Sequence, residues 1–113
     1  MRILFISESL LTGDLAYHLK KEGHEVRLFI EDDSCVECYK NLVDRTLDWK
    51  SELSWVGHDG LIIFEDLGMA AEQEDLRKAG YTVFGTSALA EQTENSRAFG
   101  NEIFKKSGLR TVP

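Results

Sequence analysis

Two short groups of oxygen-bearing side chains each follow directly on a run of apolar residues, at 2–6 (Arg-Ile-Leu-Phe-Ile) and at 61–64 (Leu-Ile-Ile-Phe). Carboxylates and hydroxyls can bind amines or sugar hydroxyls through hydrogen bonds. We take these residues as a candidate substrate-binding set, and the alternative is that all of them are solvated loop residues. The set consists of Ser7, Glu8, Ser9, Glu65 and Asp66.

The turn after residues 2–6 excludes two common nucleotide sites. A dinucleotide-binding turn needs three glycines at G-x-G-x-x-G spacing, but residues 7–13 contain Gly13 alone. No Gly-Lys-Ser or Gly-Lys-Thr sequence of a P-loop occurs either. Nucleotide binding wholly within these residues is therefore unsupported, although the N-terminus of the helix that follows the turn could attract an anion.

Cys35 and Cys38 have the spacing of a Cys-x-x-Cys redox pair or of half a zinc site. No second cysteine pair exists to complete a structural zinc site, and the three histidines show no metal-site spacing. The alternative is a pair of small thiols partly buried near a helix start. We expect no metal site in this chain.

Composition limits the classes of partner. The chain has 113 residues, of which 42% are hydrophobic, and a net charge of −7 with acids and bases mixed along its length. Its densest basic group is only Lys105, Lys106 and Arg110, so nucleic-acid binding is not expected. No stretch has the apolar length of a signal peptide or a membrane span, and the cytoplasm is the expected location.

Apolar periodicity predicts the elements that must position the candidate residues. Strands are expected at 2–6, 25–30, 61–64 and 82–84, and helices from Thr12 to Gly23, over 35–56, 69–79 and 88–107, with Ser96 able to cap a second helix in the last. This alternation predicts one α/β domain over 1–113. We expect three layers (α/β/α) and a Rossmann-like parallel sheet of about four strands in the order 2-1-3-4.

In such a sheet, ligands bind outside the carboxyl ends of the strands, where successive connections leave in opposite directions. For the order 2-1-3-4 that crevice lies between the first and third strands, at 2–6 and 61–64. Both groups of candidate side chains would line it.

The last third of the chain carries a more specific pattern, at 83–87 (Val-Phe-Gly-Thr-Ser), 94–99 (Glu-Asn-Ser-Arg-Ala-Phe) and 106–111 (Lys-Ser-Gly-Leu-Arg-Thr). It resembles the end of the N-terminal domain of phosphoribosylamine–glycine ligase (phosphoribosylglycinamide synthetase). There a Phe-Gly-Pro turn leads to a Glu-Gly-Ser-Lys-x-Phe helix and an Ile-Pro-Thr exit. Residues 59–64 and Glu65 are similar to the family's third strand and the Glu of its Pro-Glu-x-Pro-Leu loop.

The resemblance implies a pre-ATP-grasp domain, which contributes substrate contacts beside the nucleotide cleft of an ATP-dependent carboxylate–amine ligase of purine biosynthesis. It implies an ATP-grasp module in cis after residue 113, and ATP and Mg²⁺ as cofactors of the full-length enzyme. The chain itself would hold no cofactor and would be inactive alone. Its ligand would be a small-molecule amine or phosphoribosyl substrate. A chain ending in Arg-Thr-Val-Pro, with Pro113 where an extended segment begins, is typical of a fragment.

The chain also departs from the family pattern. The family's glycine-rich loop contains Gly-Gly-Arg-Glu-His, where this chain has residues 9–13 (Ser-Leu-Leu-Thr-Gly). Of the Pro-Glu-x-Pro-Leu loop, only Glu65 is retained among the residues 64–68, and Arg97 replaces a Lys. These differences favour a paralogue with a different amine substrate.

Two other functions fit the same order of strands and helices. One is a receiver-like or flavodoxin-like binding or signalling domain, although only Glu8 and Asp66 approximate the acidic residues that a receiver needs. The other is an interaction domain with no small-molecule ligand.

Overall fold

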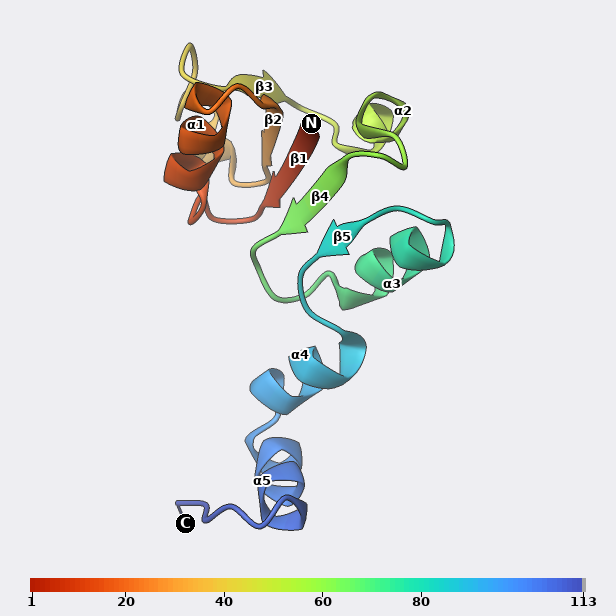
Figure 1. Ribbon diagram of the computed structural model, residues 1–113. Coiled ribbons are helices and arrows are strands. Elements are labelled where there is room, and N and C mark those ends of the chain that lie inside the picture. The colour runs from red at the N-terminus through yellow and green to blue at the C-terminus, as the bar shows by residue number, and fades with distance from the viewer. Residues whose placement is uncertain (113) are drawn as a thin grey trace.

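The computed structural model describes residues 1–112, which form a parallel five-stranded sheet with helices on both faces (Figure 1). The strand order is β3-β2-β1-β4-β5. The strands are β1 (Arg2–Ser7), β2 (Glu25–Ile30), β3 (Asp44–Thr46), β4 (Leu61–Phe64) and β5 (Val83–Phe84). The helices are α1 (Gly13–Lys21), α2 (Leu53–Val56), α3 (Ala70–Lys78), α4 (Ala88–Asn95) and α5 (Arg97–Lys106), with short 3-10 turns η1 (Asp33–Cys35) and η2 (Lys50–Glu52).

The two faces of the sheet bury separate apolar clusters. Alternate residues of β1 point to opposite faces, so Phe5 packs with Ala16 of α1, whereas Leu4 packs with Val56 of α2 and Leu76 of α3. Five consecutive residues of β1, from Ile3 to Ser7, are buried. Burial on both faces is the reason that residues 3–6 form an unbroken apolar run rather than an alternating pattern.

The fold prediction is confirmed, with one strand added. The four expected strands occupy the expected order 2-1-3-4, and the short edge strand β3 pairs beside β2. Bounds agree for β2 and β4 and differ by one residue at the end of β1 and the start of β5.

The prediction of one helix over 35–56, whole or broken, is wrong for most of the range: the strand β3 lies within it, and of its residues after Cys35 only η2 and the four-residue α2 are helical. Tyr39 and Asn41 have positive φ angles of 57° and 70°, a backbone conformation that interrupts a right-handed helix. Leu47, which has helical spacing from Val43 in the sequence, is 81% exposed, whereas Val43 is buried. Arg45 instead donates hydrogen bonds to backbone carbonyls of the loop before it, which supports an irregular chain path into β3.

The helix predicted over 88–107 forms as two helices, as the cap at Ser96 indicated. The Ser96 hydroxyl accepts a hydrogen bond from the Phe99 amide at the start of α5, and Ser87 does the same for Ala90 of α4. Helices α4 and α5 form an arm that extends away from the sheet (Figure 1). The radius of gyration is 16.3 Å, against about 13 Å for a compact domain of this length.

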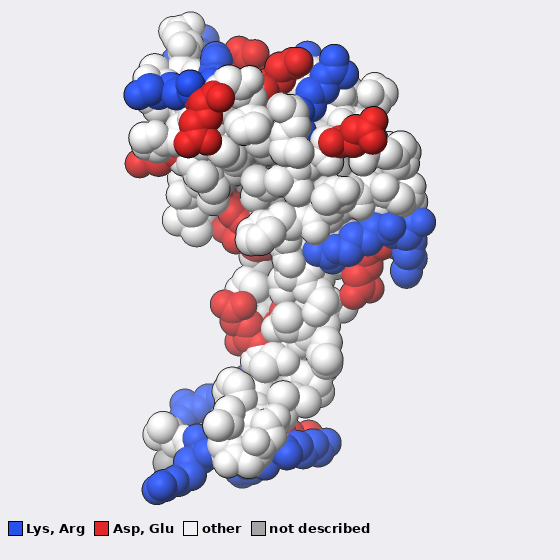
Figure 2. All heavy atoms as spheres, in the orientation of Figure 1, with Lys and Arg blue, Asp and Glu red and all other residues white. Residues whose placement is uncertain are grey.

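Figure 2 shows basic side chains gathered at the far end of the arm, where α5 ends with Lys105 and Lys106. The expected extended segment at Pro113 lies outside the described residues. No helix within residues 1–112 has both the length and the apolar character needed to cross a membrane.

Candidate functional site

The structure brings all five predicted site residues together at the carboxyl ends of strands β1 and β4. We call this end of the parallel sheet its carboxyl edge. Strands β1 and β4 are adjacent and parallel, with Ile6 opposite Phe64, so the loops that follow them start side by side. The chain leaves β1 toward α1 on one face and leaves β4 toward α3 on the other. This is the point of diverging connections at which ligands bind in open parallel sheets.

Glu65 ties the two loops together. Its Oε1 atom accepts hydrogen bonds from the Ser7 hydroxyl and, at 2.8 Å, from the Leu11 amide. The Ser7 Oγ atom also accepts a hydrogen bond from the Leu10 amide at 2.7 Å. Ser7 is only 1% exposed, so the two bonds of its hydroxyl satisfy a polar group that water does not reach.

Asp66 binds the first part of the same turn, at Glu8 and Ser9. Its Oδ2 atom accepts from the amides of Glu8 at 2.5 Å and Ser9 at 3.3 Å, and its Oδ1 atom accepts from the Ser9 hydroxyl at 3.1 Å. Leu10, with a φ of 68°, completes a tight turn. Four successive amides, those of residues 8–11, are therefore bound by oxygen atoms of the chain itself. An anion could reach these amides only by displacing those side chains.

Two buried oxygen atoms at this edge have no partner. Glu65 Oε2 and Thr12 Oγ1 are both inaccessible to solvent and make no hydrogen bond within the described residues. Buried acceptors are almost always paired, so unpaired ones mark a place for a ligand donor or an ordered water. Because Thr12 stands at the N-cap of α1 without capping it, its hydroxyl is free for that role.

Thr12 was not among the predicted site residues. The sequence offered one signal, a hydroxyl side chain where a helix begins directly after the polar turn. Helix N-capping is the ordinary explanation of a hydroxyl residue at that position, so the pattern does not indicate a ligand-binding role for Thr12. Glu8 differs from the prediction in another way, because its backbone N–H and C=O make the hydrogen bonds and its side chain is exposed.

The segment that follows β2 makes hydrogen bonds to the turn at residues 8–11 and to the start of α1. The Asp32 amide donates to the Glu8 carbonyl at 3.1 Å, and the Tyr39 hydroxyl donates to Asp14 at 2.6 Å. That hydrogen bond is the main reason that the pKa of Tyr39 is raised above its ordinary value, because the phenol proton is shared with a carboxylate. The ring of Tyr39 lies against Gly13, where an added Cβ would meet it at 2.4 Å.

Helix α4 supports the loop that follows β4. Glu91 of α4 accepts hydrogen bonds from the amides of Gly68 at 2.9 Å and Ala70 at 3.1 Å. The arm is thus joined to the loop that carries Glu65 and Asp66.

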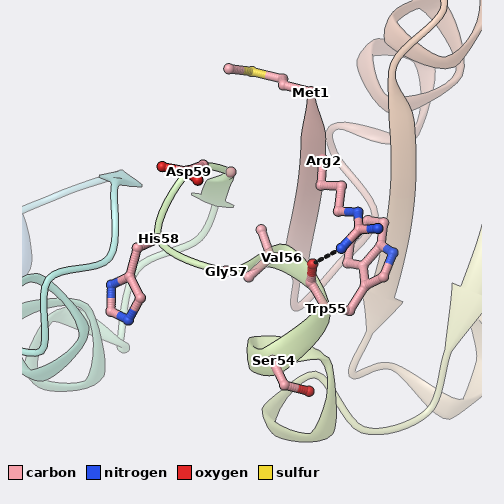
Figure 3. A pocket seen from close by; sticks show the side chains of 9 residues that line it. Met1, Arg2, Ser54, Trp55, Val56, Gly57, His58 and Asp59 are labelled. Carbon is pink, nitrogen blue, oxygen red and sulfur yellow. Dashed lines mark hydrogen bonds between the residues drawn. The ribbon is translucent and has the colours of Figure 1, made fainter.

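The opposite edge of the sheet has an open cavity of about 330 Å³ that contains none of the predicted site residues (Figure 3). Arg2 donates to the Trp55 carbonyl at 2.9 Å, and His58 stacks on Tyr81 with ring centroids 4.5 Å apart. The Arg2 guanidinium in this cavity is therefore engaged with the protein. This cavity lies at the amino ends of the strands, so the candidate site is the one at their carboxyl ends, where ligands bind in open parallel sheets.

The described residues 1–112 contain no group of three or more His, Cys, Asp or Glu side chains that could hold a metal ion. Cys35 and Cys38 are free and half-buried in the loop between β2 and β3.

The fold defines a three-layer α/β domain with an open parallel sheet, whose connections diverge at the carboxyl ends of the adjacent strands β1 and β4. No family model matches the chain, and no curated protein matches it. Among solved structures, it is similar to N5-carboxyaminoimidazole synthetase from Staphylococcus aureus complexed with ADP, with a TM-score of 0.70 and 22% sequence identity. The match covers 99% of this chain and 31% of that chain, so this chain spans about a third of that protein's length.

Proposed function

We propose that this chain is the N-terminal, substrate-side domain of an ATP-dependent ligase that joins a carboxylate to an amine, of the kind that acts in purine biosynthesis. Two independent likenesses support the proposal. One is the ordered motif pattern from Glu65 to Thr111 that resembles phosphoribosylamine–glycine ligase. The other is the fold shared with a solved synthetase, N5-carboxyaminoimidazole synthetase, over nearly the whole chain.

The buried Oε2 atom of Glu65 is the observation that carries the substrate side of this proposal. The atom is held in place because Oε1 of the same carboxylate is fixed by Ser7 and Leu11. A fixed carboxylate oxygen with no partner is suited to an ammonium, amine or sugar hydroxyl, each of which donates hydrogen bonds. Thr12 Oγ1 could accept a second bond from the same ligand or donate one to it.

The closed turn at residues 8–11 supports a changed amine substrate. In the glycine-rich loop of the resembled family, the backbone is free to approach a phosphate. Here Glu65, Asp66 and the Ser7 hydroxyl bind the turn's amides. The chain therefore suits a paralogue whose amine substrate does not place a phosphate on this turn.

ATP and magnesium do not fit the described residues. Residues 1–112 contain no cluster of metal-ligating side chains, and the chain has no glycine-rich phosphate loop. The proposal therefore assigns both to an ATP-grasp module in cis, in a cytoplasmic protein. Apolar side chains that the arm leaves exposed could pack against such a module; they include Leu89, Phe104 and Leu109.

Calorimetric titration of the natural protein that carries this chain together with the expected module tests the proposal. We expect ATP with magnesium to bind, and absence of nucleotide binding by that protein overturns the proposal. Glu65→Gln, which replaces Oε2 by an amide nitrogen that can only donate, should raise the KM for the amine at least tenfold and leave ATP affinity unchanged. Glu8→Gln is the matched control, because the Glu8 side chain is exposed.

A further inference from the structure

Cys35 and Cys38 lie at the two ends of one tight turn. The Cys38 amide donates a hydrogen bond to the Cys35 carbonyl at 2.9 Å, which closes a four-residue turn. Such turns bring their end Cα atoms within about 7 Å, and disulfides span Cα separations of about 4.4–6.8 Å. The backbone therefore holds the two cysteines near the separation of a disulfide.

Arg45 fixes that turn to the sheet. Its guanidinium donates to the carbonyls of Cys35 at 3.3 Å, Val36 at 3.2 Å and Cys38 at 2.5 Å. The Nε atom of the same side chain donates to the Leu28 carbonyl on β2 at 3.2 Å. All the acceptors of these bonds are backbone carbonyls, so formation of a bond between the two sulfur atoms need not break any of them.

The pKa of the Cys38 thiol is raised above its ordinary value chiefly by the neighbouring Cys35 thiol, and burial raises it further. Both cysteines are half-buried and free, so small reagents can reach the pair.

We propose that Cys35 and Cys38 are a modification site that forms a reversible intrachain disulfide by exchange with a small disulfide such as oxidised glutathione. The Cys35 thiolate attacks one glutathione sulfur, forming a mixed disulfide and releasing one glutathione thiolate, which takes up the proton that Cys35 lost. Cys38 then loses its proton, attacks the Cys35 sulfur and expels the second glutathione, which takes up a proton. Two protein thiols are oxidised, and one glutathione disulfide is reduced to two thiols.

The two cysteines are close in the chain to residues that contact the candidate site at the carboxyl ends of β1 and β4, so their oxidation state can affect that site. They lie between Asp32, whose amide binds the Glu8 carbonyl, and Tyr39, which packs on Gly13. The proposal concerns the cysteines alone and does not depend on the proposed ligase function.

Intact-mass measurement on the folded 113-residue chain tests the proposal. After incubation with excess oxidised glutathione, acid quenching and alkylation, we expect the chain to lose two hydrogen atoms and to carry no alkyl group. Dithiothreitol should restore two alkylatable thiols. Cys35→Ser and Cys38→Ser each remove the partner and should yield chains that cannot form the intrachain bond.

A second measurement tests the role of the turn. Arg45→Met should lower the ratio of disulfide to dithiol several-fold at a fixed glutathione ratio. Lys106→Met, on α5 and away from the turn, should leave it unchanged, and circular dichroism verifies that both variants fold. Stable glutathione adducts on the unsubstituted chain, disulfide-linked dimers, or thiols that do not react all overturn the proposal. So does a disulfide that forms no more readily in the folded chain than in urea.

Discussion

Replacing Glu65 by alanine should destabilise the chain strongly, although the residue lies in a loop. The change removes two hydrogen bonds to one carboxylate oxygen, from the buried Ser7 hydroxyl and from the more exposed Leu11 amide. A hydrogen bond to a charged group contributes about 1.5–3 kcal/mol, and an ordinary one about 0.5–1.5 kcal/mol, which is the range we take for the more exposed Leu11 bond. The expected loss of unfolding free energy is therefore about 3 kcal/mol.

Glu8→Ala is the matched control. It removes the same charge from the neighbouring loop, but the Glu8 side chain is exposed and the hydrogen bonds of this residue come from its backbone. The expected change is within about 0.5 kcal/mol, as for other surface substitutions. Glu65→Gln retains an acceptor at Oε1 and exchanges charged hydrogen bonds for neutral ones, so it should fall between the two, at about 1–2 kcal/mol.

Urea unfolding followed by tryptophan fluorescence and circular dichroism measures these differences, since Trp49 and Trp55 pack with the core. With a denaturant slope of about 1.5 kcal/mol per molar, a loss of 3 kcal/mol moves the midpoint down by about 2 M. If Glu65→Ala and Glu8→Ala have midpoints that coincide, Glu65 does not join the two loops in the way described here.

Three further predictions concern groups near the site and in the core. Gly13→Ala should cost about 1–3 kcal/mol in thermal unfolding, because the new Cβ meets the Tyr39 ring at 2.4 Å; the cost should shrink when Tyr39 is also changed to alanine, and an equal cost in both backgrounds contradicts the clash. One of the three tyrosines should ionise at higher pH than the others in an ultraviolet titration, and Tyr39→Phe should remove that step. The pKa of Tyr39 is raised only in the folded state, so the hydrogen bond from its protonated hydroxyl contributes to the free energy of unfolding. That contribution is complete below the unfolded pKa of about 10 and is lost as the pH rises through the folded pKa. Gln73→Met should leave the free energy of unfolding in urea unchanged or raise it by about 1 kcal/mol. The Gln73 side chain is fully buried with Nε2 unpaired, and the substitution removes only the 3.3 Å hydrogen bond from Arg77 to Oε1. A clear loss of stability contradicts this reasoning.

The sheet could be predicted from the sequence because its signals are local. Residues 25–30 carry apolar side chains at alternate positions and 61–64 are a short apolar run, and both form strands with those bounds. The segment 35–56 could not be predicted, because its path depends on Arg45 binding carbonyls of a loop up to ten residues earlier. Periodicity contains no information about such bonds.

The site was predictable at the level of loops but not of atoms. Parallel strands that are neighbours in the sheet place the residues after them together, so the meeting of Ser7 with Glu65 followed from the strand order. Which oxygen atoms bind the turn, and which remain unpaired, depends on side-chain conformations that residue types do not specify. For that reason the closed turn at residues 8–11 and the free hydroxyl of Thr12 were visible only in the structure.

The position of β1 in the sheet also has a consequence for the order of folding. Ile3 pairs with Val26, 23 residues away (26 − 3), and with Leu61, 58 residues away (61 − 3). Closing the longer loop costs more chain entropy, so we expect the β1-α1-β2 unit to form before β4 joins it. Pulse-labelling hydrogen exchange should show amides of β2 protected earlier than those of β4, and simultaneous protection contradicts this order. The edge that holds Ser7 against Glu65 would then be among the last parts of the chain to assemble, so a chain that presents it has already completed its sheet.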